Sequence, residues 1–276
     1  MPFITEDLQY ITVRLEGQTN SGISVGTGFY FGYKERLFLV TNKHVVSDVV
    51  NGSFVSMCAK VENGVKTPLL GQGLKIPFNK ENFIGHPDPV TDVSVMNLSD
   101  IVNQLESNAS HIYYKCITLD SIPNKEQIQQ LIAPLEEIVF IGYPSDIWDT
   151  ANLLPVMRKG VTATPYFVDF KGKPQFLIDA SVFPGSSGSP VFIYHAGSYV
   201  DRNGTVHIGS LLFFIGIIAM VFTQNERGQI IIEEAPTQLR FYTEIQQMID
   251  LGVVFKPIAI IETAVYYLSE TSKDNR

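Results

Sequence analysis

The sequence predicts an all-β protein made of two blocks of short antiparallel strands, followed by a helix late in the chain. Runs of alternating or β-branched residues recur and are separated by polar turns, such as residues 32–35 and 171–173. The 21 glycines and 15 prolines are spread along the chain, as expected for many short elements joined by turns. This pattern favours barrels or a sandwich.

The first block of strands covers residues 1–120, and a linker follows at residues 121–135. Apolar alternation predicts strands at residues 10–17, 24–33, 36–42, 93–99 and 114–119. Within the linker, residues 124–135 have a pattern that favours a short helix.

The second block covers residues 136–235. Strands are predicted at residues 136–144, 159–170, 173–181, 189–194, 207–222 and 229–235. Residues 208–222 form a run of 15 residues without a charge, whereas a membrane-spanning helix needs roughly 20. This run contains two glycines and many isoleucines, so we interpret it as buried strands.

The C-terminal part, residues 236–276, is predicted to hold a helix and a tail. Residues 236–252 give the strongest helix pattern, because Pro236 and Thr237 suit a helix start and Gly252 suits an end. An apolar stripe joins these ends through Leu239, Tyr242, Ile245 and Ile249. Residues 253–268 fit either a strand or a helix, and residues 269–276 form a polar tail.

Composition excludes several function classes. Apolar residues make up 45% of the chain, which indicates a folded protein. The net charge is −8 and no basic face stands out, so we expect neither nucleic acid nor an anionic membrane as a partner. The N-terminus lacks a signal-peptide pattern, and Cys58 and Cys116 are too few for a disulfide framework, so we expect two buried thiols in a reducing cytoplasm. No spacing predicts a metal site, and no cofactor is expected.

The stretch "FPGSSGSPVF", residues 183–192, could carry a nucleophile or could be a Gly-Ser turn between strands. A serine hydroxyl attacks only with a base in reach and with donors aimed at the oxyanion that forms. Gly185 has no Cβ and can turn its N–H inward beside that of Ser187, while Gly188 lets the chain leave sharply. Ser186 and Ser189 are the local rivals for the nucleophile.

A base and an acid stand elsewhere in the chain. His44 directly follows the apolar run "LFLV" and the polar break "TNK", and Asp92 precedes the alternating run "VSVMNL". The alternative for His44 is a histidine at a strand end that only the backbone satisfies. Asp88, framed by two prolines, fits a surface turn, and Asp48 lies near His44 in sequence. The remaining histidines lack the context of His44 and are expected on the surface: His86, His111, His195 and His207.

Together these stretches resemble the trypsin-like, chymotrypsin-fold serine peptidases. "GTGF…LVTNKHVV" resembles that family's histidine segment, "TDVSV" its aspartate segment and "GSSGSPVF" its nucleophile segment. "IVFIGYP" is similar to the opening of its second barrel and "IGIIAM" to its substrate-binding strand, so the resemblance covers about residues 10–250. The His–Asp–Ser order differs from that of α/β-hydrolases, where the histidine comes last.

The resemblance implies two packed six-stranded antiparallel β-barrels with a C-terminal helix, and a serine endopeptidase. Ser187, which precedes Gly188, would be the nucleophile, His44 the base and Asp92 its orienting partner. The segment Gly185, Ser186 and Ser187 would form the oxyanion hole, with the N–H groups of Gly185 and Ser187 as donors.

The resemblance also suggests a specificity pocket. Ser181 and Val182 would lie at its base, and the opposite wall would comprise Ile218, Ala219, Met220 and Val221. None of these residues is charged, and an unpaired buried charge is unfavourable, so we expect small or apolar side chains before the cut bond.

The chain departs from the secreted digestive members of this family at Ser186, where they carry an aspartate that pairs with a newly cut N-terminus. The family's disulfides are also missing. The sequence therefore predicts the intracellular bacterial type, without processing at the N-terminus and acting on a protein or peptide. Two alternatives remain: a catalytically silent peptide-binding module of the same fold, and a peptidase that is inactive until a partner switches it on.

Overall fold

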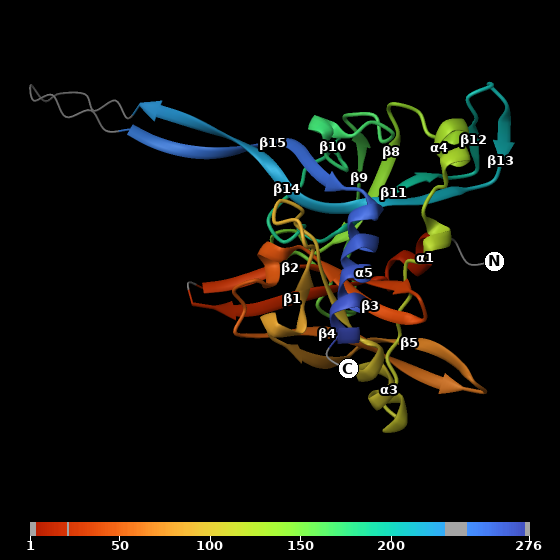
Figure 1. Cartoon of the computed structure of the whole chain (residues 1–276), viewed down its shortest axis with the longest axis vertical. Coiled ribbons are helices and arrows are strands. Elements are labelled where there is room, and N and C mark those ends of the chain that lie inside the picture. The colour runs from red at the N-terminus through yellow and green to blue at the C-terminus, as the bar shows by residue number, and fades with distance from the viewer. Residues whose placement is uncertain (1–3, 21, 230–241, 274–276) are drawn as a thin grey trace, which may run out of the picture.

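Seven antiparallel strands form the N-terminal half of the protein in the computed structural model, which describes residues 4–20, 22–229 and 242–273 (Figure 1). Their order in the sheet is β5-β4-β1-β2-β3-β7-β6. Their bounds are β1 Thr12–Thr19, β2 Gly22–Tyr33, β3 Arg36–Thr41, β4 Asn51–Glu62, β5 Val65–Phe78, β6 Ile84–Gly85 and β7 Ser94–Asn97.

Six strands of the C-terminal half close into a barrel in the order β10-β15-β14-β11-β8-β9. Their bounds are β8 Glu137–Gly142, β9 Val156–Thr162, β10 Gln175–Asp179, β11 Pro190–His195, β14 Leu211–Gln229 and β15 Tyr242–Phe255. A small sheet pairs β12, Ser198–Val200, with β13, Val206–Ile208. The predicted fold class is confirmed as a mostly β protein with a closed six-stranded barrel, a second sheet and a C-terminal helix.

The helices are short except for the last one. The α-helices are α1 Ile4–Leu8, α2 Lys43–Val46, α3 Ser99–Ser107, α4 Lys125–Leu131 and α5 Pro257–Lys273. The single 3₁₀ turns are η1 Lys80–Asn82, η2 Leu119–Ser121, η3 Pro144–Asp146 and η4 Phe170–Gly172. The short helix expected in the linker is confirmed as α4, which Asn124 and Gln127 close with a reciprocal capping box.

The helix predicted at residues 236–252 is wrong, since residues 242–252 belong to β15 and residues 236–241 lie outside the described part of the chain. Strand β15 pairs with β14 over residues 242–255 and with β10 over residues 251–255. Pairing on both sides satisfies the backbone of the last residues, so tertiary contacts override the helical spacing of the apolar residues. The C-terminal helix begins only at Pro257, which suits the first turn of a helix.

Other predicted elements differ in extent. Residues 114–119 form no strand and reach the sheet only through a bridge between Ile117 and Phe31. Strand β9 ends at Thr162, well before residue 170. The long β4–β5 hairpin was not predicted, and most of the strand predicted at residues 229–235 lies outside the described residues.

One apolar cluster joins the two halves, and each half also has a cluster of its own. Phe29 of β2 packs its ring 5.6 Å from that of Phe214 of β14, and both side chains are fully buried. Helix α5 joins this core through Ile260 and Ala264, and its Tyr267 packs edge-on against Phe38 of β3. The same cluster therefore holds both sheets and the C-terminal helix together.

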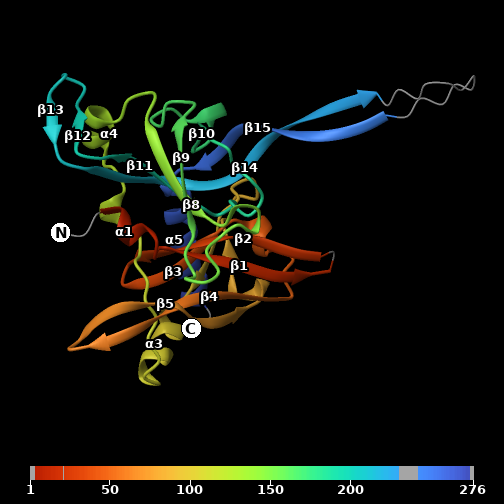
Figure 2. The same cartoon turned by 180° about the vertical axis from the view of Figure 1, so that it is seen from behind.

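The β14–β15 pair extends well beyond the barrel as a two-stranded ribbon, which Figures 1 and 2 show from opposite sides. The uncharged run at residues 208–222 falls in β13 and β14, so its interpretation as strands is confirmed. In the part of the chain that is described, no helix combines the length and apolar character needed to cross a bilayer.

Candidate active site

His44 lies on α2, immediately after β3 leads the chain out of the first sheet. Asn42 ends the extended backbone and is the residue before the helix. Val45 and Val46 are buried in the core of the first sheet, whereas half of the His44 side chain is exposed. The short helix thus fixes the position of the imidazole through its buried neighbours and leaves the ring open to solvent.

Asp92 holds His44 at two points, the imidazole and the backbone. Its Oδ2 lies 2.5 Å from His44 Nδ1, and its Oδ1 accepts the His44 backbone N–H at 3.1 Å. The Asn42 amide donates to the Asp92 carbonyl at 2.6 Å, which ties the aspartate to the start of α2. A carboxylate only accepts hydrogen bonds, so this contact selects the imidazole tautomer with its proton on Nδ1 and leaves Nε2 as an acceptor.

The other two aspartates near His44 have different surroundings. Asp88 accepts hydrogen bonds from the Val90 N–H and the Thr91 hydroxyl, and these bonds lower the pKa of its carboxyl. Lys43 donates to the Asp88 carbonyl at 2.7 Å. Asp88 therefore closes the turn before Asp92, as predicted, and Asp48 is exposed.

Ser187 lies in the second of two consecutive tight turns. Residues 183–186 close through the Ser186 N–H and the Phe183 carbonyl at 3.0 Å, with Pro184 and Gly185 (φ +87°) at the central positions. Residues 186–189 close through the Ser189 N–H and the Ser186 carbonyl at 3.0 Å, with Gly188 at φ +89°. Both have the features of type II turns, which require a residue that tolerates positive φ at the third position.

The two glycines are also fixed by close contacts. A Cβ on Gly185 would lie 2.3 Å from the Tyr143 carbonyl oxygen, and one on Gly188 would lie 1.9 Å from the Thr27 carbonyl oxygen. No side chain fits at either position without displacing backbone. The glycines of the motif are therefore needed both for the turn geometry and for the close approach of neighbouring strands.

Hydrogen bonds fix the orientation of the peptides around Ser187. The Pro184 carbonyl accepts from the Ser145 N–H at 2.6 Å, and the Ser186 carbonyl is taken by the second turn. In a trans peptide the carbonyl and the following N–H point in opposite directions. The N–H groups of Gly185 and Ser187 therefore point away from these partners, whereas the Ser186 N–H is engaged with Phe183.

Thr27 of β2 is a residue that the sequence analysis did not single out. Its backbone N–H donates to the Ser187 carbonyl at 2.8 Å, and its hydroxyl donates to the Gly185 carbonyl at 2.9 Å. The same hydroxyl accepts from the Tyr143 N–H at 3.3 Å. Thr27 lies inside the quoted stretch "GTGF", but its partners are more than a hundred residues away in sequence, so no local pattern could reveal them.

The three predicted residues His44, Asp92 and Ser187 open onto one cavity of about 440 Å³. Val182, Ile218, Ala219 and Met220 also line it, with Phe183 and Pro184. Ile218 and Ala219 are buried, while half of Met220 is exposed. Ser181 is exposed and is not part of this lining, and the side chain of Val221 lies outside the described set.

Among the remaining histidines and the cysteines, His86, Cys58 and Cys116 differ from expectation. The His86 side chain is only 8% exposed, so its assignment to the surface is wrong. Each of the four histidines is half-buried or buried and contacts a carboxylate: His86 with Glu262, His111 with Glu106, His195 with Glu136 and His207 with Asp201.

Cys116 is exposed and Cys58 is half-buried, so neither is the fully buried thiol that we expected. Over the described ranges, no three His, Cys, Asp or Glu side chains gather in a way that could hold a metal ion.

A family model described as a trypsin-like peptidase domain matches residues 26–200, which is more than half of the chain. The matched range includes His44, Asp92 and Ser187. The chain belongs to the trypsin-like peptidase family. This membership confirms the resemblance seen in the sequence. No curated protein sequence matches this trypsin-like chain.

Several solved structures are similar to this member of the family. A serine endoprotease from Yersinia pestis is 17% identical, with 79% of this chain and 56% of that chain covered and a TM-score of 0.41. The HtrA-type protease AlgW, solved with a tripeptide, is 17% identical, with 93% and 60% covered and a TM-score of 0.43. The MamO protease domain from Magnetospirillum magneticum is 13% identical, with 94% and 97% covered and a TM-score of 0.45. The chain thus spans less than two thirds of the first two proteins.

Proposed function

We propose that this chain hydrolyses peptide bonds through an acyl-enzyme, with Ser187 as nucleophile, His44 as base and Asp92 as its orienting partner. The observation that carries the proposal is the His44–Asp92 pair, whose imidazole shares one cavity with the Ser187 hydroxyl. Because Asp92 selects the tautomer with a free Nε2, that nitrogen is available to accept the hydroxyl proton.

The reaction would follow two steps. Ser187 Oγ attacks the scissile carbonyl carbon while its proton moves to His44 Nε2, and the substrate oxygen becomes an oxyanion. The Gly185 and Ser187 N–H groups would stabilise this charge, and Ser186 is left out because its N–H is bonded to Phe183. His44 then gives the proton to the leaving amine, and water releases the acid product from Ser187 by the reverse sequence.

We also propose that the enzyme prefers small or apolar side chains before the cut bond. The cavity is apolar at Val182, Ile218 and Ala219, and none of these three side chains could pair with the charge of a lysine, arginine or glutamate. Cleavage of a peptide library should therefore favour alanine, valine or leucine at that position. A strong preference for arginine, lysine or glutamate would contradict this reasoning.

We propose that the enzyme does not need a cut at its N-terminus to become active. The Ser186 side chain is 1% exposed, and its hydroxyl has no hydrogen-bond partner among the described residues. A neutral hydroxyl cannot form the ion pair that a new N-terminal ammonium would need. We propose a reducing compartment, the cytoplasm, because Cys58 and Cys116 are both free.

Labelling with a fluorophosphonate tests the nucleophile directly. Ser187 Oγ would bond to phosphorus and fluoride would leave, so the wild-type chain should be labelled and Ser187→Ala should not. Ser186→Ala is the matched control, since that hydroxyl is buried beside the same turn, and it should keep the label. Equal labelling of wild type and Ser187→Ala, or none in either, would overturn the assignment of the nucleophile.

A further inference from the structure

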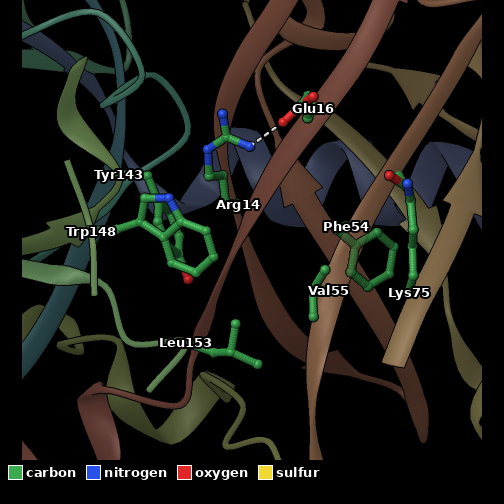
Figure 3. A pocket seen from close by; sticks show the side chains of 9 residues that line it. Arg14, Glu16, Phe54, Val55, Lys75, Tyr143, Trp148 and Leu153 are labelled. Atoms are coloured by element: carbon green, nitrogen blue, oxygen red, sulfur yellow. Dashed lines mark hydrogen bonds and ion pairs between the residues drawn. The ribbon is translucent and has the colours of Figure 1, made fainter. Parts of the chain in front are cut away.

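A second cavity, of about 230 Å³, lies between the first sheet and the segment that follows β8 (Figure 3). Strands β1, β4 and β5 form one side, and residues 143–153 form the other. Nine residues line it: Arg14, Glu16, Ser53, Phe54, Val55, Lys75, Tyr143, Trp148 and Leu153. None of them lines the cavity that contains Ser187.

The chemistry of the lining is apolar with a cationic edge. Trp148 packs edge-on against Tyr143 with ring centroids 5.7 Å apart, and Figure 3 shows both rings facing Phe54 and Val55 across the cavity. Arg14 forms an ion pair with Glu16. Lys75, which is exposed at the opposite side, makes no ion pair within the described residues. A compact apolar group that carries a carboxylate would complement these walls.

The segment that lines this cavity also holds the turn before Ser187. The Ser145 N–H donates to the Pro184 carbonyl at 2.6 Å, and the Tyr143 carbonyl packs against Gly185. Both contacts fix the peptide whose N–H we propose as an oxyanion donor. A change in residues 143–145 would therefore change the oxyanion hole.

The far end of the segment is attached to β5. The Gly71 N–H of β5 donates to the Asn152 carbonyl at 3.2 Å. Within the segment, Asp149 and Leu154 exchange backbone hydrogen bonds at 3.0 and 3.1 Å. Ser145 and Leu153 adopt positive φ values of 46° and 61°, which are unfavourable for residues other than glycine. Contacts from a ligand to Trp148 and Leu153 would stabilise this conformation relative to others.

We propose that this cavity is an effector site for a small acid with an apolar body, and that its occupation raises the peptidase activity. The proposal rests on the proposed function, because the coupling runs through the Gly185 turn. The acid could be a free metabolite or the C-terminal residue of a peptide, and both present the same apolar group and carboxylate. By filling the space beside Trp148, the ligand holds residues 143–153 and thereby the oxyanion turn.

Trp148 provides a direct readout, because it is the only tryptophan in the chain. Its fluorescence is titrated in the full chain with 3-phenylpropionate, with N-acetylphenylalanine and with the uncharged N-acetylphenylalanine amide. For ligands of about a dozen heavy atoms we expect saturation with a dissociation constant on the order of 1 mM for the acids. The amide should bind about fivefold or more weakly. Saturation by N-acetylphenylalanine alone would assign the site to peptide ends, and saturation by both acids would admit free acids as well.

Variants separate specific from general binding. Lys75→Ala should lower the affinity for both acids about fivefold. Lys125 lies on α4 and outside the lining, so Lys125→Ala should leave the affinity unchanged. Turnover of a peptide substrate at saturating acid should rise about fivefold or more. Flat titrations with both acids, or equal affinity for acid and amide, would overturn the site. Binding without a change in turnover would overturn the coupling.

The Ser187→Ala variant keeps this test distinct from the test of catalysis, because its Trp148 should titrate as in the wild type. If Trp148 titrates but the wild type neither hydrolyses peptides nor reacts with the fluorophosphonate, the proposed function fails and the binding site stands. If the wild type hydrolyses peptides but Trp148 does not respond, the site fails and the proposed function stands.

Discussion

Replacement of Thr27 by valine tests whether the first sheet positions the oxyanion turn of the second. Thr27 is completely buried, and its hydroxyl donates to the Gly185 carbonyl at 2.9 Å and accepts from the Tyr143 N–H at 3.3 Å and from the Ser189 hydroxyl at 3.4 Å. Thr27→Val keeps the branched shape and the backbone N–H that contacts Ser187, but it puts a methyl group where these polar partners need a hydroxyl.

The expected effect on stability follows mainly from the two shorter contacts, with the Gly185 carbonyl and the Tyr143 N–H. Each buried polar group that loses its hydrogen bond destabilises the folded state by roughly 1–3 kcal/mol, and the longer contact to Tyr143 belongs at the low end. The free energy of unfolding should therefore fall by about 2–4 kcal/mol. The Gly185 carbonyl belongs to the peptide between the two proposed donor peptides. When it loses its hydrogen bond, we expect the turn to shift and an adjacent oxyanion donor to be misplaced; losing such a donor typically lowers turnover by about 10²-fold or more.

Urea unfolding and steady-state kinetics on a fluorogenic peptide measure the two effects separately. Thr27→Ser is the matched control, because it keeps the hydroxyl and removes only a methyl group, at a cost of about 1 kcal/mol. Its kcat should stay within about threefold of the wild type. If Thr27→Val loses stability but retains the wild-type kcat, the hydroxyl does not position the turn, and the reasoning is refuted.

Three further predictions concern the residues around the cavity. Asp92→Asn should fold normally but lower kcat by about 10⁴-fold, because an amide can favour the wrong tautomer of His44; a loss under tenfold would contradict this role. Gly188→Ala should yield no folded protein by circular dichroism, since its Cβ would lie 1.9 Å from the Thr27 carbonyl oxygen; a wild-type melting curve would contradict the contact. Hydrogen bonds from Val90 and Thr91 lower the pKa of the Asp88 carboxyl in the folded protein. Ionised Asp88 therefore stabilises the folded state at pH values above the pKa that this carboxyl has in the unfolded chain, and this contribution is lost as the pH falls through its pKa in the folded protein. Urea midpoints of wild type and Asp88→Asn should therefore converge as the pH falls from 5 toward 3, and a constant gap would argue against it.

The candidate site was largely accessible from sequence because each of its three residues sits in a distinctive local context. His44 follows a buried strand and an asparagine at the helix N-terminus, Asp92 precedes an alternating strand, and Ser187 lies between glycines that adopt positive φ. Such contexts depend on neighbours within a few residues. Ser181 was less well placed, because the distance of a residue from a pocket depends on how the following loop bends.

The elements that were missed or misassigned depend on contacts between distant segments. The outer part of the β4–β5 hairpin is largely exposed, so its sequence shows little of the alternation that marks a half-buried strand. Residues 242–252 carry a helical spacing of apolar residues but pair with β14, whose sequence is needed to explain the strand. His86 looked like a surface residue because Glu262, its partner on α5, is 176 positions away in sequence.

The geometry of the nucleophile turn depends on the interface between the two sheets as well as on its own sequence. Thr27 of the first sheet holds the Gly185 and Ser187 carbonyls, and Ser145 of the segment after β8 holds the Pro184 carbonyl. Gly142 belongs to the same interface, because a Cβ there would lie 2.1 Å from the Ser189 hydroxyl. A chain could therefore retain the sequence "GSSGSP" and still lose a correctly oriented oxyanion donor if any of these partners moved. The cavity beside Trp148 contacts neither Ser187 nor His44. It can still affect the chemistry, because residues 143–153 both line this cavity and anchor the nucleophile turn.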